Sequence, residues 1–178
     1  MVFARNREAA SFLSKVWRER NDVTKVYWAR VQHWPPYRND NKKLEGRIDL
    51  PLSPSEERLK WKVSKDGKPS TTLWRVKNES VSGPVVLVLT PVTGRTHQLR
   101  IHCAHTGCAI EGDSLYGEQG RKQQLSHEHR LCLHAQTLSF PHPKTKRKLT
   151  FETAPFWSQG DATSAVIGAK DDAKTGTS

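Results

Sequence analysis

One stretch of the chain places basic, amide and imidazole side chains closely enough to do chemistry together: Pro91-Val-Thr-Gly-Arg-Thr-His-Gln-Leu-Arg-Ile-His102. A β-branched run over residues 85–89 precedes it, and Gly107 follows it. This order predicts a strand, a tight turn with positive φ at Gly94, and a helix that is capped by Thr96 and ends at Gly107. The exposed amides and positive side chains expected at the start of this helix favour binding of an anion, phosphate first.

The charge balance of the whole chain favours a polyanionic partner. Lys and Arg number 29 against 18 for Asp and Glu, so the formal net charge is +11. An excess of this size is typical of proteins that bind RNA or DNA, although a basic protein without a nucleic-acid role remains an alternative.

Other bulk features indicate the compartment. The chain has no apolar run of about 18 residues, which argues against a transmembrane helix, and its first residues turn polar at once, unlike a secretory signal. Its 3 cysteines are an odd set that suits free thiols in a reducing environment. We therefore expect a cytoplasmic or organellar protein (mitochondrion or chloroplast) that is not secreted and has no membrane partner.

The pattern of apolar residues predicts one domain over residues 1–157 and a disordered polar tail over residues 158–178. A helix is expected over residues 7–19, with Asn6 as its cap and an apolar face at helical spacing. Strands are expected over residues 1–5 (the tail of one), 24–31, 46–52 (an edge strand), 71–77, 85–89, 130–140 and 149–153. Residues 55–70 are expected to form an exposed loop, and the basic turn over residues 141–148 to face phosphate or solvent.

The sequence argues against other kinds of catalytic or metal site. It contains no Gly-x-Ser-x-Gly elbow, no dinucleotide fingerprint and no phosphate-binding loop of the Walker type. Asp113 stands in a glycine-rich turn, where capping of the backbone is favoured over catalysis. Two clusters of histidine and cysteine lack the paired spacing of zinc ligands, and Cys108 and Cys132 are read as small core residues. The clusters are His102, Cys103, His105 and Cys108, and His127, His129, Cys132 and His134.

Several motifs resemble the RluA-like family of RNA pseudouridine synthases. The resemblance rests first on the stretch from Pro91 to His102 and on Gly107-x-x-Ile-x-Gly-Asp-x-x-Tyr-Gly117. It continues in Lys25-x-Tyr-x-Ala-x-Val31, in Gly46-x-Ile-Asp-x-Pro-Leu52 and in Arg130-Leu-x-Leu-His-Ala. The similarity covers about residues 1–157. It implies an α+β fold with a mixed, mostly antiparallel sheet and flanking helices.

The resemblance also implies a reaction. These enzymes flip a chosen uridine out of RNA, break its N1–C1′ bond and rejoin the base through C5, without a cofactor or a metal. By similarity, Tyr27 would stack on the uracil and help to remove the C5 proton, and Arg100 would pair with a catalytic aspartate. Arg95, Thr96, His97 and Gln98 would contact the RNA, either rRNA or tRNA, and the protein is expected to be a monomer.

The chain departs from the family pattern in one respect. The catalytic aspartate of the family stands in His-Arg-Leu-Asp-x-x-Thr-Ser-Gly, just before a segment that resembles Met1-Val-Phe-Ala, and no aspartate of this chain has that context. We therefore expect the motif and the N-terminal strands to lie upstream of Met1, so that Arg100 has no carboxylate partner and the chain is inactive alone. The alternatives are a degenerate RNA-binding protein that does not catalyse, and an unrelated metal- or protein-binding module.

Overall fold

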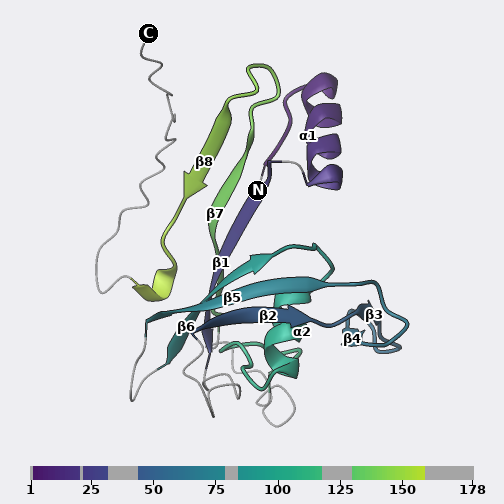
Figure 1. The fold of residues 1–178 in the computed structure, drawn as a ribbon, viewed down its shortest axis with the longest axis vertical. Coiled ribbons are helices and arrows are strands. Elements are labelled where there is room, and N and C mark those ends of the chain that lie inside the picture. The colour runs from purple at the N-terminus through teal and green to yellow at the C-terminus, as the bar shows by residue number, and fades with distance from the viewer. Residues whose placement is uncertain (1, 21, 32–43, 79–83, 118–129, 159–178) are drawn as a thin grey trace. The chain divides into compact units, whose positions relative to one another are not determined.

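The computed structural model describes residues 2–20, 22–31, 44–78, 84–117 and 130–158, and Figure 1 shows their elements. The chain forms two compact units, one of residues Val26–His134 and one of Met1–Lys25 with Ala135–Ser178. The helices are α1 (Arg7–Glu19), α2 (Gln98–His105) and a 3₁₀ turn, η3 (Phe156–Ser158). The strands are β1 (Thr24–Val31), β2 (Glu45–Asp49), β3 (Leu52–Pro54), β4 (Trp61–Val63), β5 (Thr71–Asn78), β6 (Val85–Pro91), β7 (Leu133–Pro141) and β8 (Lys148–Glu152).

In the unit of residues 26–134, β2, β5, β6 and β1 lie next to one another in that order. The pairs between them are antiparallel, and their register places Trp74 opposite Leu89 and Leu89 opposite Tyr27. The predicted pairing of residues 71–77 with 85–89 is confirmed, and β2 is at the edge, as expected for the segment 46–52. An α+β fold with a mostly antiparallel sheet is therefore confirmed.

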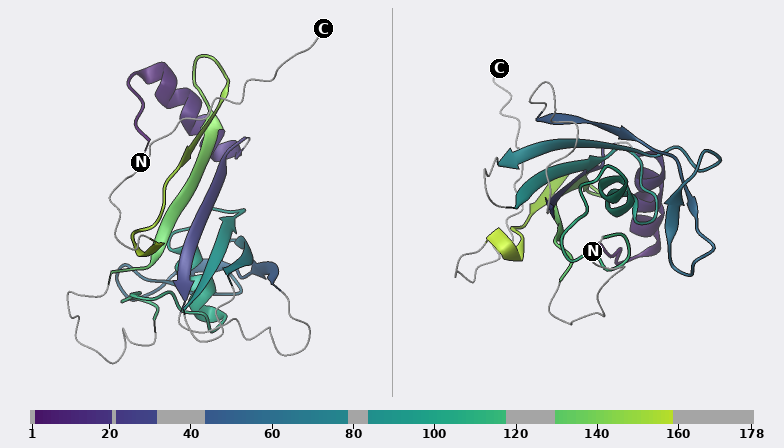
Figure 2. Two further views of the ribbon diagram at one scale, coloured as in Figure 1. Left: turned by 90° about the vertical axis from the view of Figure 1, so that its left-hand side faces the viewer. Right: turned by 90° about the horizontal axis from the view of Figure 1, so that it is seen from below.

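Helix α2 packs on one face of this sheet, as the right-hand view in Figure 2 shows. Leu99, Ile101 and Cys103 are buried, and Thr72 of β5 is buried beneath the helix. Apolar side chains that alternate along β1 and β6 complete this core: Ala29, Val31, Val85, Leu87 and Leu89. Burial of these side chains, at about 1.5–3 kcal/mol for each large one, fixes the helix against the strands.

The segment expected to be one long loop contributes one strand, β4, to a small second sheet. Strands β3 and β4 pair antiparallel, with Leu52 opposite Val63. Leu52 is fully buried, and its backbone exchanges hydrogen bonds of 3.0 and 2.8 Å with Lys68. A Cβ atom at Gly67 would lie 2.6 Å from the carbonyl carbon of Leu52, so only glycine permits this approach. Residues 55–70 were expected to form an exposed loop; the expectation missed β4 within it, because a three-residue strand leaves too short a pattern.

In the other unit, α1 is the helix that the sequence predicts. The Asn6 side chain accepts a hydrogen bond of 2.8 Å from the Ala9 amide, which caps its first turn. Trp17 on its apolar face contacts Phe140 of β7, and the two ring centroids are 5.2 Å apart. β7 pairs antiparallel with β8, which confirms the predicted closing hairpin. The segment 1–5 was expected to end a strand, but residues 2–5 have no strand structure.

Two further findings bear on the expectations. Residues 159–178, which carry the expected tail, and His127 and His129 lie outside the described residues. Within the described part, no helix has the length and apolarity to cross a membrane.

Candidate active site

The turn that leads into α2 is closed by a buried glutamine rather than by Thr96. The helix begins at Gln98, and its cap residue is His97, which has a left-handed backbone (φ 52°, ψ 17°) and makes no side-chain cap bond. The Gln98 amide oxygen instead accepts hydrogen bonds from the Thr93 hydroxyl (2.6 Å) and the Arg95 amide (3.1 Å). The predicted cap at Thr96 was therefore wrong, and Thr96 is exposed.

The turn before α2 was expected to need a positive φ at Gly94, but other residues have it. Positive φ is found at His97 and at Gly107, where it ends α2 as predicted, but not at Gly94. A Cβ atom built on Gly94 would meet nothing within 4 Å. The expectation of a left-handed Gly94 was wrong because the chain reverses at His97 instead.

Gln98, one of the four residues expected to touch RNA, is used inside the protein. It is 3% exposed, and its amide nitrogen donates to the Thr71 carbonyl (2.9 Å) and the Thr72 hydroxyl (3.0 Å). With its oxygen already accepting two bonds, the side chain has used both N–H groups and both lone pairs. Gln98 thus ties the start of α2 to β5, and it has no hydrogen-bonding capacity left for a ligand.

His102 anchors the same helix one turn further on. It is fully buried, with Nδ1 at 2.9 Å from the Thr72 hydroxyl and Nε2 at 3.2 Å from the Leu50 carbonyl oxygen. Burial lowers the pKa of its imidazole below the ordinary value, which keeps it neutral. No group of His, Cys, Asp and Glu that could hold a metal ion occurs among the described residues.

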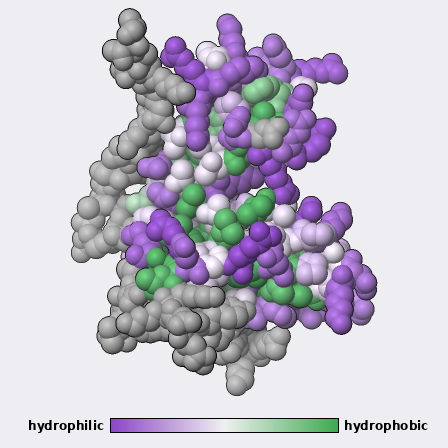
Figure 3. All heavy atoms as spheres, viewed as in Figure 1, coloured by the Kyte–Doolittle hydropathy of each residue, from purple (hydrophilic) through white to green (hydrophobic). Residues whose placement is uncertain are grey.

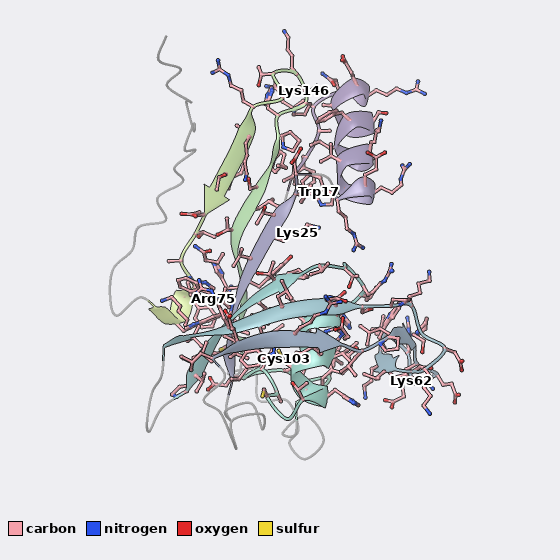
Figure 4. All side chains as sticks on the ribbon, in the orientation of Figure 1. Trp17, Lys25, Lys62, Arg75, Cys103 and Lys146 are labelled. Atoms are coloured by element: carbon pink, nitrogen blue, oxygen red, sulfur yellow. The ribbon has the colours of Figure 1, made fainter. Side chains whose placement is uncertain are left out.

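The cysteines are buried and unpaired, as expected of small core residues. Figure 4 shows Cys103 on α2, below the strands of its unit. Burial raises the pKa of the Cys108 thiol to about 11 and raises the pKa of the Cys103 thiol as well. Neither thiol is therefore a nucleophile near neutral pH.

Arg100 has a carboxylate partner, contrary to expectation. Its Nε donates to Asp113 Oδ2 (2.9 Å) and its Nη2 to Asp113 Oδ1 (2.6 Å), which forms a two-point ion pair. The Arg100 side chain is 15% exposed and that of Asp113 is 1% exposed. The expectation of an unpaired Arg100 was wrong because residues 107–113 fold back across the helix, a contact that local sequence patterns do not reveal.

The turn that carries Asp113 is fixed from several sides. The Glu111 amide donates to the Arg30 carbonyl of β1 (2.9 Å), and Gly112 has a φ of 71°. A Cβ atom at Gly112 would lie 2.3 Å from the Arg130 carbonyl oxygen, so no other residue fits there. The turn therefore holds Asp113 at a defined position beside α2.

The surroundings of Asp113 do not suit the role that the resemblance gives to a catalytic aspartate. Besides its two bonds from Arg100, its Oδ1 accepts the amides of Leu115 (3.0 Å) and Tyr116 (2.9 Å), which confirms the expected backbone-capping role. Burial alone would raise its pKa, but the Arg100 hydrogen bond and the Tyr116 amide outweigh this and lower it. A buried carboxylate with both oxygens engaged is ionised but has no path to attack a substrate.

Tyr116 contacts several residues of the site, and sequence reasoning did not identify it. Its hydroxyl accepts the Trp61 amide of β4 (3.0 Å) and lies 3.0 Å from Nδ1 of His97. The Arg100 guanidinium carbon lies 5.1 Å from the centre of the Tyr116 ring, in cation–π contact. The only available signal was its position next to Gly117 at the end of the second motif, which indicates a turn but not these partners.

Tyr27 lies on the sheet face that α2 covers. It is opposite Leu89, which is opposite Trp74, and side chains that face each other across antiparallel strands lie on the same side. Trp74 and Thr72 share a face of β5, and Thr72 bonds Gln98 of α2. Tyr27 is half-buried, burial raises the pKa of its phenol, and its hydroxyl has no hydrogen bond to any described residue.

The expected site residues therefore do not form a single cluster. His97 and Arg100 meet at Tyr116, Gln98 is internal, and Tyr27 is on the same sheet face without a direct bond to Arg100 among the described residues. Arg95 is half-exposed, with only long hydrogen bonds of 3.4 Å from its guanidinium to the Pro69 carbonyl. The arrangement offers cationic and donor groups at the start of a helix, and a tyrosine ring on the sheet below.

Comparison with known proteins gives a consistent assignment. The family profile described as RNA pseudouridylate synthase matches residues 1–105. The dual-specificity RNA pseudouridine synthase RluA of Vibrio parahaemolyticus is 40% identical over 152 residues, which are 82% of this chain and 56% of that protein. RluA of Pasteurella multocida is 36% identical over 157 residues, or 87% of this chain and 67% of that protein.

The solved structures agree. Human RNA pseudouridylate synthase domain containing 1 superposes with a TM-score of 0.68 at 27% identity, covering 85% of this chain and 62% of that one. The chain thus spans between about half and two thirds of the length of these relatives. From the profile and the relatives together, the chain belongs to the RNA pseudouridylate synthase family.

Proposed function

We propose that this chain forms part of an enzyme that isomerises uridine to pseudouridine in RNA. The observation that carries the proposal is the geometry of Arg100. Asp113 engages the edge formed by Nε and Nη2. A guanidinium has five N–H donors, so the two on Nη1 and one on Nη2 remain, and they have no hydrogen-bond partner among the described residues. That remaining edge suits a second carboxylate.

The second carboxylate of the proposal is the aspartate of a His-Arg-Leu-Asp motif, which is not among these 178 residues. Asp113 would then orient Arg100, and Arg100 would hold the catalytic aspartate ionised. Tyr27, whose hydroxyl is unengaged by described residues, would stack on the flipped uracil and take part in removing the C5 proton. The activity accordingly belongs to a protein that contains both this chain and the motif.

RNA is the proposed partner, and charge supports it. The chain has a formal net charge of +11, and in Figure 3 the described unit of α1, β7 and β8 presents a surface that is mostly hydrophilic around an apolar patch. At α2, the proposed RNA contacts are Arg95, Thr96 and His97, which are exposed or half-exposed. Gln98 would act indirectly, by holding the turn that carries them.

The test is release of tritium from RNA labelled at C5 of uridine, with a protein that includes the aspartate motif. We expect release by the unmodified protein, and a fall of at least about 100-fold for Tyr27→Phe, since loss of a positioned acid–base group costs about that much. RNA affinity should change little in that variant because the ring is retained. Unaltered release by Tyr27→Phe would remove Tyr27 from the mechanism.

A second candidate is a non-catalytic RNA-binding protein of the same fold. The observation in its favour is that Asp113 already compensates Arg100, so the helix does not need another carboxylate for its stability. This candidate predicts that the 178-residue chain binds RNA with an affinity that falls as salt rises, and that adding the aspartate motif gives no tritium release. Tritium release by the protein that contains both the chain and the motif would reject this candidate and support the enzyme.

A further inference from the structure

Tyr116 uses its backbone amide, its ring and its hydroxyl to contact different residues of the site. Its backbone amide donates to Asp113 Oδ1 (2.9 Å), which fixes where the residue sits. Its ring lies against the Arg100 guanidinium, at 5.1 Å from ring centre to carbon. Its hydroxyl lies 3.0 Å from both the Trp61 amide and Nδ1 of His97.

The hydroxyl determines which ring nitrogen of His97 carries the proton. The Trp61 amide can only donate, so it occupies a lone pair of the Tyr116 oxygen. The phenolic hydrogen has no acceptor among the described residues other than His97 Nδ1. When the phenolic hydrogen is used within the protein, Nδ1 is therefore its acceptor, and in a neutral imidazole the proton is then on Nε2.

His97 is neutral near physiological pH, as this assignment requires. Burial lowers the pKa of its imidazole, the positive charge of Arg100 lowers it further, and the Asp113 carboxylate opposes them only partly. The ring is half-exposed, and Nε2 has no hydrogen bond to any described residue. The nitrogen that is left for a ligand is therefore a donor.

We propose that Tyr116 is the positioning residue of this site: its hydroxyl fixes His97 with Nε2–H presented to an acceptor oxygen of RNA, while its ring supports Arg100. The proposal rests on the proposed function for the identity of the ligand. One side chain, itself placed by Asp113, thus sets both the direction of a hydrogen-bond donor and the plane of a cation. Its bond to the Trp61 amide ties this arrangement to the small sheet of β3 and β4.

The backbone of His97 makes such support necessary. A residue other than glycine at φ 52° is in the left-handed region, which costs about 1 kcal/mol for a residue of this type. No side-chain cap bond is made at this helix start. The Tyr116 hydroxyl therefore supplies a constraint on the His97 ring that the turn itself does not provide.

The first test needs no substitution. Long-range ¹⁵N–¹H correlation spectra of the chain at pH 7.5 report the protonation of each His97 nitrogen. We expect an unprotonated Nδ1 and a protonated Nε2, and in Tyr116→Phe a mixture of both tautomers. Tyr27→Phe is the matched control, because it also removes one phenolic hydroxyl but should leave the His97 spectrum unchanged. A protonated Nδ1 in the unmodified chain would overturn the proposal.

The second test asks which nitrogen of His97 binds RNA. The amide nitrogen of glutamine can take the place of Nε2, whereas that of asparagine reaches only the place of Nδ1. We expect His97→Gln to keep the RNA affinity within about twofold and His97→Asn to lose about fivefold, the value of one hydrogen bond. The left-handed backbone favours asparagine over glutamine, so retained binding by His97→Gln cannot be a backbone effect.

The outcomes separate this proposal from the proposed function. If the unmodified chain binds no RNA in 50 mM salt while the His97 spectra are as expected, the RNA partner is wrong and the Tyr116–His97 pair remains. If RNA binds and Tyr116→Phe changes neither the His97 spectrum nor the affinity, the positioning role is wrong. Equal affinities of His97→Gln and His97→Asn would reject Nε2–H as the donor.

Discussion

Replacing Asp113 by asparagine removes a negative charge from a side chain that is 1% exposed and leaves the Arg100 guanidinium beside an amide. The asparagine oxygen can still accept the Leu115 and Tyr116 amides, but its NH₂ group would take the place of Oδ2 and face the Nε donor of Arg100. Removing one partner of a buried ion pair costs about 3–5 kcal/mol. Arg100 is 15% exposed, so water relieves part of this, and we expect about 3 kcal/mol for Asp113→Asn.

Asp113→Ala should cost more, about 4 kcal/mol, because the two backbone amides lose their acceptor as well. The measurement is urea unfolding followed by circular dichroism, in which a loss of 3 kcal/mol lowers the midpoint by about 1–2 M. A double-mutant cycle with Arg100→Met isolates the pair, and we expect a coupling energy of about 2 kcal/mol. A coupling energy near zero would show that the two-point contact adds nothing to stability, and it would refute the reasoning about this pair.

The pH dependence gives an independent check of the same pair. The Arg100 hydrogen bond and the backbone amides outweigh burial and lower the Asp113 pKa in the folded protein. The stabilisation is therefore complete above the unfolded pKa of about 3.9 and is lost as the pH falls through the folded value. The stability difference between the unmodified chain and Asp113→Asn should be constant from pH 7 to about pH 5 and shrink below pH 4. If this stability difference already shrinks near neutral pH, the titration of another group is responsible for it.

Two further predictions concern the turns and the RNA surface. Gly112→Ala should destabilise the chain by more than about 2 kcal/mol, since its Cβ would overlap the Arg130 carbonyl, whereas Gly94→Ala, with open space, should stay within about 0.5 kcal/mol in thermal unfolding. Affinity for single-stranded RNA should fall as salt rises, and the slope of log affinity against log salt measures the phosphate contacts. Neutralising two exposed cations where the β7–β8 turn enters β8 should reduce this slope by about 1.4, whereas neutralising a matched pair on β5 should leave it unchanged. These pairs are Arg147 with Lys148, and Arg75 with Lys77. Equal slopes in the two double variants would mean that RNA binding depends on net charge and not on the position of the cations.

The choice of these pairs follows from the structure. His142 Nδ1 accepts the amides of Lys144 (3.3 Å) and Thr145 (3.1 Å), so the β7–β8 turn has a built conformation. Lys146 at its tip lies over the Phe12 ring of α1, 3.4 Å from its centre, and Figure 4 shows it beside the helix. Arg75 lies on the sheet face opposite α2, where it lines a shallow groove of about 500 Å³ with Leu73 and Val88.

Elements set by local patterns could be predicted from the sequence. Helix α1 and its Asn6 cap follow from an apolar stripe and one capping side chain, and β1 follows from a run of strand formers between polar residues. Gly107 at the end of α2 was predicted for the same reason, since a left-handed position at a helix end selects glycine. Each of these signals lies within a few residues of what it determines.

The parts of the site that depend on distant residues could not be predicted. Thr96 does not cap the helix, because Gln98 bonds Thr93 and β5 instead. Its partner in β5, Thr72, is 26 residues away in the sequence. The pair of Arg100 and Asp113 joins positions 13 residues apart, and the Trp61–Tyr116 bond joins positions 55 apart. Neither helical nor strand periodicity contains information on such pairs.

The pairing of Arg100 changes how its proposed role in catalysis should be understood. An arginine that met only the catalytic aspartate would depend on that residue for its orientation, and its own position would vary before RNA binds. Here Asp113 holds one edge of the guanidinium and the Tyr116 ring contacts it, so the remaining edge is directed before any further carboxylate is present. Preorganised cations stabilise a charged group without reorganising at the moment of reaction. Arg100→Lys, which keeps the charge but lacks the second edge, should therefore lose uridine conversion while retaining RNA binding.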